Sequence, residues 1–571
     1  MNNQKRLGDL ARRLEGISQR SDLAHSLTKQ SSTLAAQIDH HELVIPVVGA
    51  FSAGKSSLLN RLMGREVLPT DITPETSLAT ELHHGLKEQI EAIRKDGSFE
   101  TFGFHQFDDL KSRAKEFSFV RAYIPNDALK ALEPLILVDM PGFESPLDAH
   151  NQAILTYLSR GSHYVVLSSV EEGTVQEPII RQLIEMKTLH RGFTFLVSKA
   201  DLKPSKDVDL IVTEVETVLR DRLGLKMRVT AVGLDQNDDI PSLLRSIDPE
   251  RLFLDVFSEP VRAVANSVLS AINVKIAAAT QSEGENQRLV EELRKSLAKM
   301  TEKCVRMKGE VEQKYSRVMI DDLVMAVGSA LDSAMEELVT VAAGGQGDAL
   351  SQRLSEIVRH ALTLAMGEKL ENLNSRIVGD FTTELRGLDD AMKGETIDSE
   401  FVKSLGGKIQ VAFRGILGST TPGPSATSGQ AAKAVFKTVV GALAIMTNIL
   451  APLVELVIFF LPEILGPLFS GIQKQKQANL VREKMIAEVF PSIKAKLRQE
   501  LPSLLSNQVR TMIEEIDAQF QQSIVQQEES LKKAMADAAV GGQELQAKCA
   551  LWMECRTEVQ GILAEFPGAK E

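Results

Sequence analysis

The chain has 571 residues, which is long enough for about two to four domains. Its 77 acidic residues outnumber its 65 basic ones, and the formal net charge of -12 argues against a broad nucleic-acid-binding face, because phosphate binding needs basic surface. The amino terminus is charged and lacks the apolar stretch of a signal peptide. These features predict a cytoplasmic protein of several domains with no nucleic-acid partner.

Cysteines and histidines do not predict a metal site. The chain has three cysteines, Cys304, Cys549 and Cys555, which are too few and too badly spaced for a zinc site or a disulfide framework. The histidine pairs at 40–41 and 83–84 lack a third ligand, so we expect them at the surface.

Residues 1–40 carry leucine and isoleucine at spacings of three and four, which predicts an amphipathic helix that needs partners. From residue 41 the pattern changes to short apolar runs separated mostly by helical stretches, and Asp96-Gly97 marks a hairpin turn. This order favours a mostly parallel sheet covered on both faces, in an α/β domain over residues 41–260. The runs stand at 43–48, 117–124, 135–139, 164–169, 193–198 and 227–232.

After Pro260 the strand pattern disappears, and the sequence becomes rich in Glu, Lys, Gln, Leu, Ala and Met. Long helices of this kind must bury their apolar stripes on one another, which predicts an elongated all-α bundle. We expect residues 261–417 and 473–571 to form it, with residues 1–40 packing on it. A low-complexity loop and an apolar stretch interrupt the bundle over 418–472.

Residues 49–57, GAFSAGKSS, follow an apolar strand and precede a helical stretch, and they match the pattern G-x-x-x-x-G-K-[ST]. Glycines let backbone N–H groups surround a phosphate, and the helix amino terminus adds the positive end of its dipole. Lys55 is expected to reach the β- and γ-phosphates and Ser56 to ligate Mg²⁺. The predicted nucleotide-binding residues of this loop are Gly49, Ser52, Ala53, Gly54, Lys55, Ser56 and Ser57.

A second motif, LILVD-MPG, places Asp139 at the end of an apolar strand and Gly142 in the loop that follows. A strand-end aspartate can hold the Mg²⁺ shell, and a loop glycine N–H can bond the γ-phosphate. Taken alone, the motif could also be an ordinary exit from a strand, since Asp, Pro and Gly all form turns.

A third motif, FLVSKADL, places Ser198, Lys199 and Asp201 just beyond another apolar strand. Asp201 could accept two hydrogen bonds from a guanine edge, which adenine cannot offer, and Lys199 could lie over the base. We therefore expect GTP and GDP rather than adenine nucleotides. Guanine-nucleotide sites usually have Asn or Thr where this chain has Ser198.

The stretch LPTDITPETSLATEL lies between the first two motifs and could supply a hydroxyl that closes on Mg²⁺. Thr76 is the first candidate and Thr73 the second. A solvated loop without a ligand role remains the alternative.

Together, GAFSAGKSS, LPTDITPETS, DMPG and SKAD resemble the dynamin superfamily, most closely its bacterial dynamin-like proteins, and the length is similar to the LeoA type. The resemblance implies a GTPase head over 41–260, a helical neck and trunk, a membrane-binding paddle within 418–472, and assembly through the heads, either with itself or with a second dynamin-like protein. It also assigns catalytic roles to Ser52, Lys55 and Thr76. Eukaryotic dynamins have a water-orienting glutamine where this chain has Phe51, so slow hydrolysis is expected.

The apolar stretch between Lys437 and Lys474 contains only two formal charges, Glu455 and Glu463. Prolines and these charges disfavour a membrane span. Residues 402–454 contain five Lys or Arg and no Asp or Glu, which favours peripheral insertion of about 438–472 into an anionic membrane. Burial inside the protein remains an alternative.

The prediction from sequence is thus a Mg²⁺-dependent GTPase that couples its nucleotide state to membrane binding, remodelling or vesicle formation. The alternative is a nucleotide-binding scaffold or tether with little hydrolysis, which uses the apolar stretch for partner proteins.

Overall fold

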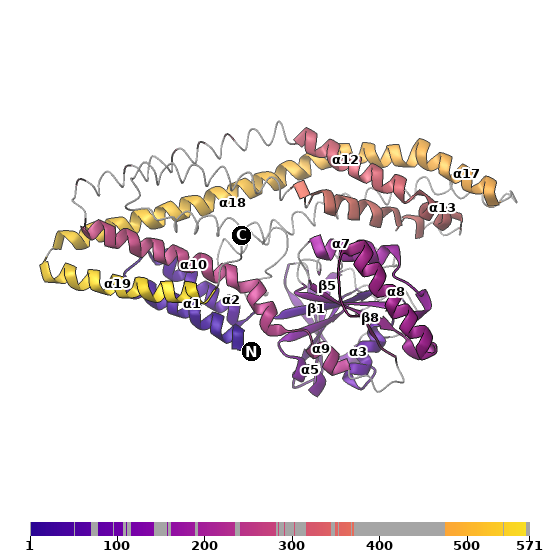
Figure 1. Ribbon diagram of the computed structural model, residues 1–571, viewed down its shortest axis with the longest axis horizontal. Helices are drawn as coiled ribbons and strands as arrows, with labels where there is room; N and C mark the ends of the chain where they lie inside the picture. The colour runs from indigo at the N-terminus through magenta and orange to yellow at the C-terminus, as the bar shows by residue number, and fades with distance from the viewer. Residues whose placement is uncertain are drawn as a thin grey trace.

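The computed structural model describes most of the α/β domain and most of the helical bundle (Figure 1). Thr73, Thr76, Gly142, Phe51 and the apolar stretch at 438–472 lie outside the described residues. The described ranges are 2–50, 52–69, 78–94, 96–106, 116–141, 161–188, 192–233, 240–280, 316–343, 349–369 and 474–566, except for positions 352, 367 and 541, together with isolated residues such as Leu110, Arg113 and Tyr157.

A nine-stranded sheet forms the α/β domain, in the order β4-β3-β5-β2-β6-β1-β7-β8-β9. The pairs β1–β6, β1–β7, β7–β8, β8–β9 and β2–β5 are parallel, whereas β2–β6, β3–β5 and β3–β4 are antiparallel. The predicted mostly parallel sheet is confirmed. The strands are β1 (Leu43–Gly49), β2 (Thr80–His84), β3 (Gln89–Arg94), β4 (Phe99–Phe102), β5 (Phe117–Ile124), β6 (Leu135–Asp139), β7 (His163–Ser169), β8 (Gly192–Ser198) and β9 (Thr230–Ala231).

Both faces of this sheet are buried, which explains why its central strands read as continuous apolar runs. Along β1, Val44 and Val48 belong to one apolar core, while Leu43, Ile45 and Val47 belong to the other. The first core includes α7 (Glu177–Thr188) and α8 (Ser205–Leu223), and the second includes α3 (Lys55–Met63), α5 (Asp127–Leu132) and α9 (Ile240–Arg245).

The second core continues into a group of five helices that we call the neck bundle. It holds buried apolar residues of α1, α2, α10 and α19, and α18 packs on α10. Figure 1 shows α18 running from α10 and α19 to the helices at the other end of the molecule. The bundle consists of α1 (Asn2–Arg20), α2 (His25–Asp39), α10 (Pro249–Thr280), α18 (Phe490–Val540) and α19 (Gly542–Ala564).

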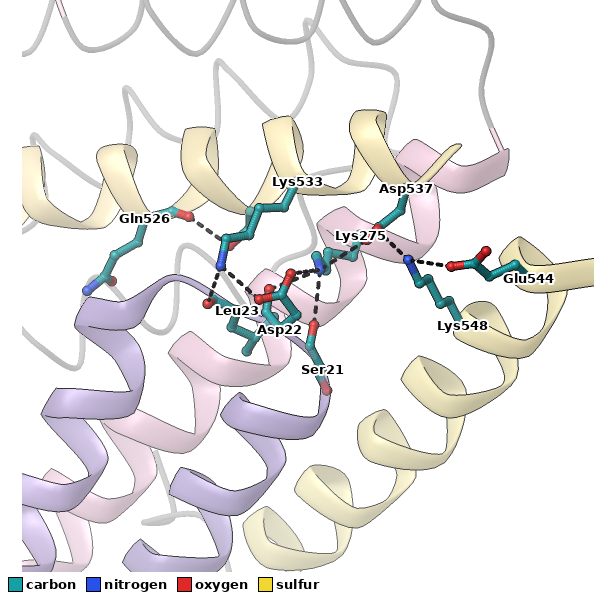
Figure 2. A network of polar contacts seen from close by, with 10 residues as sticks. Ser21, Asp22, Leu23, Lys275, Gln526, Lys533, Asp537, Glu544 and Lys548 are labelled. Atoms are coloured by element: carbon teal, nitrogen blue, oxygen red, sulfur yellow. Dashed lines mark hydrogen bonds and ion pairs between the residues drawn. The ribbon is translucent and has the colours of Figure 1, made fainter. Parts of the chain in front are cut away.

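A buried lysine joins four elements of the neck bundle (Figure 2). The Lys275 ammonium on α10 donates to the carbonyls of Ser21 and Asp22 at 3.0 Å each, in the turn between α1 and α2. It also lies 3.5 Å from Asp537 Oδ2 on α18 and 4.9 Å from the Trp552 ring on α19. Segments from both ends of the chain are therefore fastened to α10 at one point.

The first core continues into helices at the far part of the bundle. These are α12 (Ser316–Ser333), α13 (Met335–Ala343), α17 (Lys474–Lys484), the π-helical turn η7 (Met485–Val489) and the start of α18. Arg181 on α7 donates to both oxygens of Glu337 on α13, at 3.0 and 3.2 Å, so the α/β domain contacts this region directly. Among the helices described here, none is both long and apolar enough to cross a membrane.

The structure differs from the sequence-based expectation in three places. Residues 1–40 form two helices rather than one, because the chain turns at residues 21–24 and Asp22 adopts a positive φ of 46°. Helix α10 begins at Pro249 and contains Pro260, so the expected boundary at residue 260 falls inside a helix. Strand β2 was not predicted, because only Leu82 among its five residues is apolar.

Candidate functional site

The phosphate-binding pattern lies between β1 and α3. Gly49 is packed so closely on β7 that a Cβ there would lie 2.4 Å from the Leu167 carbonyl oxygen, which excludes any larger residue. Gly54 precedes α3 with a φ of 79°, in the left-handed region that favours glycine. Glycine is therefore required at the two positions for different reasons. Gly49 lies too close to the backbone of β7 for a side chain, and Gly54 has a left-handed backbone conformation.

Lys55 is the first residue of α3, and its side chain folds back over the loop. Its ammonium donates to the carbonyl oxygens of Gly49 at 3.1 Å and Ala50 at 2.8 Å. The buried Lys55 ammonium therefore lies against the predicted phosphate-binding loop, at the amino terminus of α3. It can exchange carbonyl oxygens for phosphate oxygens without moving the helix.

Ser56 and Asp139 meet at the end of the sheet. The Ser56 hydroxyl donates to Asp139 Oδ2 at 2.8 Å, while Asp139 Oδ1 is buried and has no hydrogen-bond partner among the described residues. Burial raises the pKa of Asp139 to about 6, although the Ser56 hydroxyl and the Lys55 charge both lower it.

This donor set fits Mg²⁺. A hydroxyl and a carboxylate are the oxygen ligands that a hard cation prefers, and the unpartnered oxygen Oδ1 leaves capacity for a further contact, either direct or through water.

On the other side of the loop, Ser198 ends β8. Its hydroxyl donates to the Ala53 carbonyl at 2.7 Å and lies 3.3 Å from the Ser168 carbonyl oxygen. Lys199 has a φ of 57°, and its ammonium lies 2.5 Å from Glu171 Oε2 in the 3-10 turn that follows β7 (Val170–Glu172). The third motif is therefore attached to the loop at 49–57 by Ser198.

Sequence reasoning missed Gly233, which lies against Asp201. A Cβ on Gly233 would be 2.9 Å from both the backbone nitrogen and Oδ1 of Asp201. Ala200 N–H donates to the Val232 carbonyl at 3.1 Å, so the residues after β9 and β8 are held together. A glycine directly after the apolar run at 227–232 was the available signal.

Two further predicted residues are described but have no contact that assigns a role. Ser52 is exposed in the loop, and Ser57 is half-buried in the first turn of α3. Thr76, its alternative Thr73, and Gly142 lie outside the described residues, so their roles stay predictions.

A loop with the pattern G-x-x-x-x-G-K-[ST] between a strand and a helix, a strand-end aspartate on the adjacent parallel strand, and the SKAD motif at the end of β8 are together typical of the P-loop GTPase class of α/β domain. The family model described as "Dynamin family" matches residues 45–201. These residues form a dynamin-family GTPase domain, in agreement with the resemblance read from the motifs.

Curated relatives agree with this family. The chain is 31% identical to dynamin-like protein 2 of Campylobacter jejuni over 205 residues, which are 34% of this chain and 32% of that protein. Over 173 residues it is 28% identical to the bacterial dynamin-like protein of Nostoc punctiforme, covering 27% and 24% of the two chains. The curated relatives that the chain matches are covered over 11 to 50% of their own length.

Among solved structures, a chain of an oligomerised bacterial dynamin pair aligns with 97% of this chain and 95% of its own length, at 13% identity and a TM-score of 0.32. A TM-score of this size does not establish a shared arrangement of the whole chain. The predicted similarity to the LeoA type therefore stays a prediction.

Proposed function

We propose that the α/β domain binds GTP and GDP together with Mg²⁺ and hydrolyses GTP slowly. The observation that carries this proposal is the Asp139 carboxylate, which is buried beside Lys55, accepts from Ser56 through one oxygen and leaves the other without a partner. A carboxylate in this state is suited to a cation, because a bound Mg²⁺ would supply the missing partner and offset the cost of burying the charge.

The chain's own residues divide the work. The backbone N–H groups at the start of α3 and the Lys55 ammonium would hold the phosphates and stabilise the negative charge that develops during hydrolysis. Ser56 and Asp139 would hold Mg²⁺, which supplies charge neutralisation at the phosphates. Asp201 would read the guanine edge, with Lys199 and Gly233 beside it.

Phe51 cannot orient water by hydrogen bonding, so the intrinsic rate should be low. Ser52 and Thr76 would complete the catalytic loop, and Gly142 would contact the γ-phosphate. We expect nucleotide binding to be readily measurable even where turnover by the isolated protein is not.

The proposal extends to membranes through residues 438–472. These residues contain two charges and overlap a segment, 402–454, that has five basic residues and no acidic ones. Apolar side chains next to a cluster of basic residues are suited to peripheral binding to an anionic membrane at the cytoplasmic face. Self-association through the GTPase domains, or pairing with a second dynamin-like protein, would gather such segments on one surface.

Titration calorimetry tests the nucleotide part. Mg²⁺-GTP and Mg²⁺-GDP should bind, Mg²⁺-ATP should bind at least about tenfold more weakly, and Lys55→Ala should remove most of the affinity. Asp201→Asn should reduce the preference for GTP over ATP, because the amide replaces one of the two acceptor oxygens with an NH₂ donor. Equal affinity for GTP and ATP in the unsubstituted protein would contradict the guanine assignment.

Co-sedimentation with vesicles of anionic phospholipid tests the membrane part. The full chain should pellet with the vesicles, and Phe459→Asp combined with Phe460→Asp should abolish pelleting while leaving nucleotide affinity unchanged. Nucleotide binding without pelleting and without turnover would favour the scaffold that uses residues 438–472 for partner proteins.

A further inference from the structure

A second polar cluster lies within the apolar core behind the nucleotide site. Glu81 on β2 is 0% exposed, and its carboxylate has partners from three elements. Oε2 accepts from Arg121 Nε on β5 at 2.9 Å and lies 3.3 Å from His83 Nε2, and Oε1 accepts from the Tyr157 hydroxyl at 2.9 Å. The expectation that His83 is a surface residue is wrong, because it is 6% exposed and packs against Tyr123.

A buried carboxylate is an expensive way to fill this space. Burying charges costs several kcal/mol that their attraction does not fully recover, and an apolar side chain of similar size often serves stability as well or better. Burial lowers the pKa of Arg121 while Glu81 raises it, and the net shift is upward, so the two groups are charged partners. Unlike an apolar side chain, the carboxylate makes directional hydrogen bonds, and these fix the relative positions of β2, β5 and Tyr157.

Two consecutive residues of β2, Thr80 and Glu81, contact Asp139 and Tyr157, respectively. Thr80 pairs with Asp139 in the antiparallel ladder between β2 and β6. Glu81, the next residue, holds the Tyr157 hydroxyl. The backbone of Tyr157 is itself fixed, since its carbonyl accepts from the Tyr164 hydroxyl at 2.7 Å and from Gly161 N–H at 2.8 Å.

We propose that Glu81 is a positioning residue for the nucleotide site. Arg121 joins Glu81 to β5, and Tyr157, whose carbonyl accepts from Tyr164, joins it to β7. These contacts hold β2 to strands on the two sides of β6, which lies between β2 and β1 in the sheet, and they thereby set the position of the Asp139 carboxylate for a triphosphate-bound Mg²⁺. This inference rests on the proposed function, and it assigns to Glu81 a part in distinguishing Mg²⁺-GTP from GDP. Glu81 acts through its neighbours and does not itself touch the nucleotide.

Tyr157→Phe is the sharpest test, because it removes one hydroxyl and keeps the ring. A hydrogen bond to a charged group contributes about 1.5–3 kcal/mol, so affinity for a non-hydrolysable GTP analogue with Mg²⁺ should fall about tenfold or more. Affinity for GDP with the metal chelated should change less than about twofold. Equal losses for both nucleotides, or no loss for either, would overturn the proposal.

Tyr123→Phe is the matched control. It removes the same group from β5, where the Tyr123 hydroxyl donates to Glu91 of β3 at 3.3 Å, and it keeps the ring that packs against His83. It should leave both affinities unchanged. Glu81→Gln is a second variant, which keeps an acceptor for Tyr157 but loses the charge that Arg121 faces. It should reproduce the selective loss of affinity for the Mg²⁺-bound GTP analogue.

Hydrogen–deuterium exchange of the nucleotide-free protein separates this inference from the proposed function. Tyr157→Phe should accelerate amide exchange in β2 and β6, whereas Tyr123→Phe should not. Unchanged exchange in β2 and β6 would overturn the positioning role even if nucleotide affinity fell. If the unsubstituted protein bound no guanine nucleotide, the proposed function would fail, and the exchange data would still decide the link between Glu81 and Asp139.

Discussion

The nucleotide site and the neck bundle each bury a charged group, and they treat it in opposite ways. At the nucleotide site, Asp139 keeps one carboxylate oxygen without a partner. In the neck bundle, the Lys275 ammonium has two backbone carbonyls, a nearby carboxylate and an aromatic face around it. Both positions carry the cost of burial, and among the described residues the Lys275 ammonium has more partners to offset it than the Asp139 carboxylate has.

This difference supports the proposal that Asp139 serves a ligand, whereas Lys275 serves the fold. Burial lowers the pKa of Lys275, while Asp22 and Asp537 raise it, so the surrounding groups compensate part of the burial. Burial raises the pKa of Asp139 to about 6, with Ser56 and Lys55 opposing it only in part. A group left in this condition is expected to gain from a cation that the protein itself does not supply.

Lys275→Met should have the largest effect on stability. It keeps the length of the side chain but leaves the carbonyls of Ser21 and Asp22 without their donor, so unfolding free energy should fall by about 3–5 kcal/mol. Urea unfolding followed by the fluorescence of Trp552, the single tryptophan, reports directly on this cluster. Nucleotide affinity should remain unchanged.

Lys533→Met provides the control for Lys275. Lys533 bonds Asp22 Oδ1 at 2.9 Å and the Leu23 carbonyl at 3.0 Å, but its side chain is 33% exposed. Because water replaces such contacts, its loss should cost at most about 1 kcal/mol. Equal costs for the two lysine variants would break the contrast between a buried and an exposed member of the same network.

Asp139→Asn should stabilise the nucleotide-free protein while weakening Mg²⁺-GTP binding. The raised pKa means that the carboxylate's contribution to stability is present below about pH 4 and is lost as pH rises through about 6. At pH 7 the neutral amide should therefore gain at most about 3 kcal/mol in thermal or urea unfolding. A variant that loses stability and keeps Mg²⁺-GTP affinity would contradict the assignment of Asp139 as a ligand group.

His163→Gln should have a smaller effect that depends on pH. Burial lowers the pKa of His163 to about 4, so the folded protein resists a proton that the unfolded chain accepts. Stability from this group is present above about pH 6.5 and is lost as pH falls towards 4. Between pH 7.5 and 5, the unsubstituted protein should lose about 2 kcal/mol more than the variant, whose amide can still bond Thr194.

Much of the α/β domain was predictable because its signals are local. The apolar runs at 117–124 and 135–139 coincide with β5 and β6, and Asp96-Gly97 stands in the β3–β4 turn, where Gly97 has a φ of 85°. The loop at 49–57 was recognisable for the same reason, since Gly54 and Lys55 act through neighbours in sequence, whereas Gly49 is required by Leu167 on β7. Near the carboxyl terminus, Trp552 and Cys555 are buried in the second core.

Other features depend on partners far away in sequence. The sequence around Glu81 does not predict a buried carboxylate, because its partners Arg121 and Tyr157 lie 40 and 76 residues away in sequence. His83 looked like a surface residue for the same reason. The requirement for glycine at position 233 could not be predicted, because it comes from the contact with Asp201 after another strand. The sequence pattern predicted a continuous helix through Asp22, because Lys275 and Lys533, which hold the turn there, lie far away in sequence.

The sequence by itself determined the kind of domain, the loop that would hold phosphates and the helical nature of the remainder, because periodicity and tight turns are properties of adjacent residues. Only the tertiary structure decided which buried charges are satisfied and which are left for a ligand. Hydrogen-bond partners are chosen in space, and the sequence order of Glu81, Arg121 and Tyr157, or of Asp22, Lys275 and Asp537, carries no record of that choice.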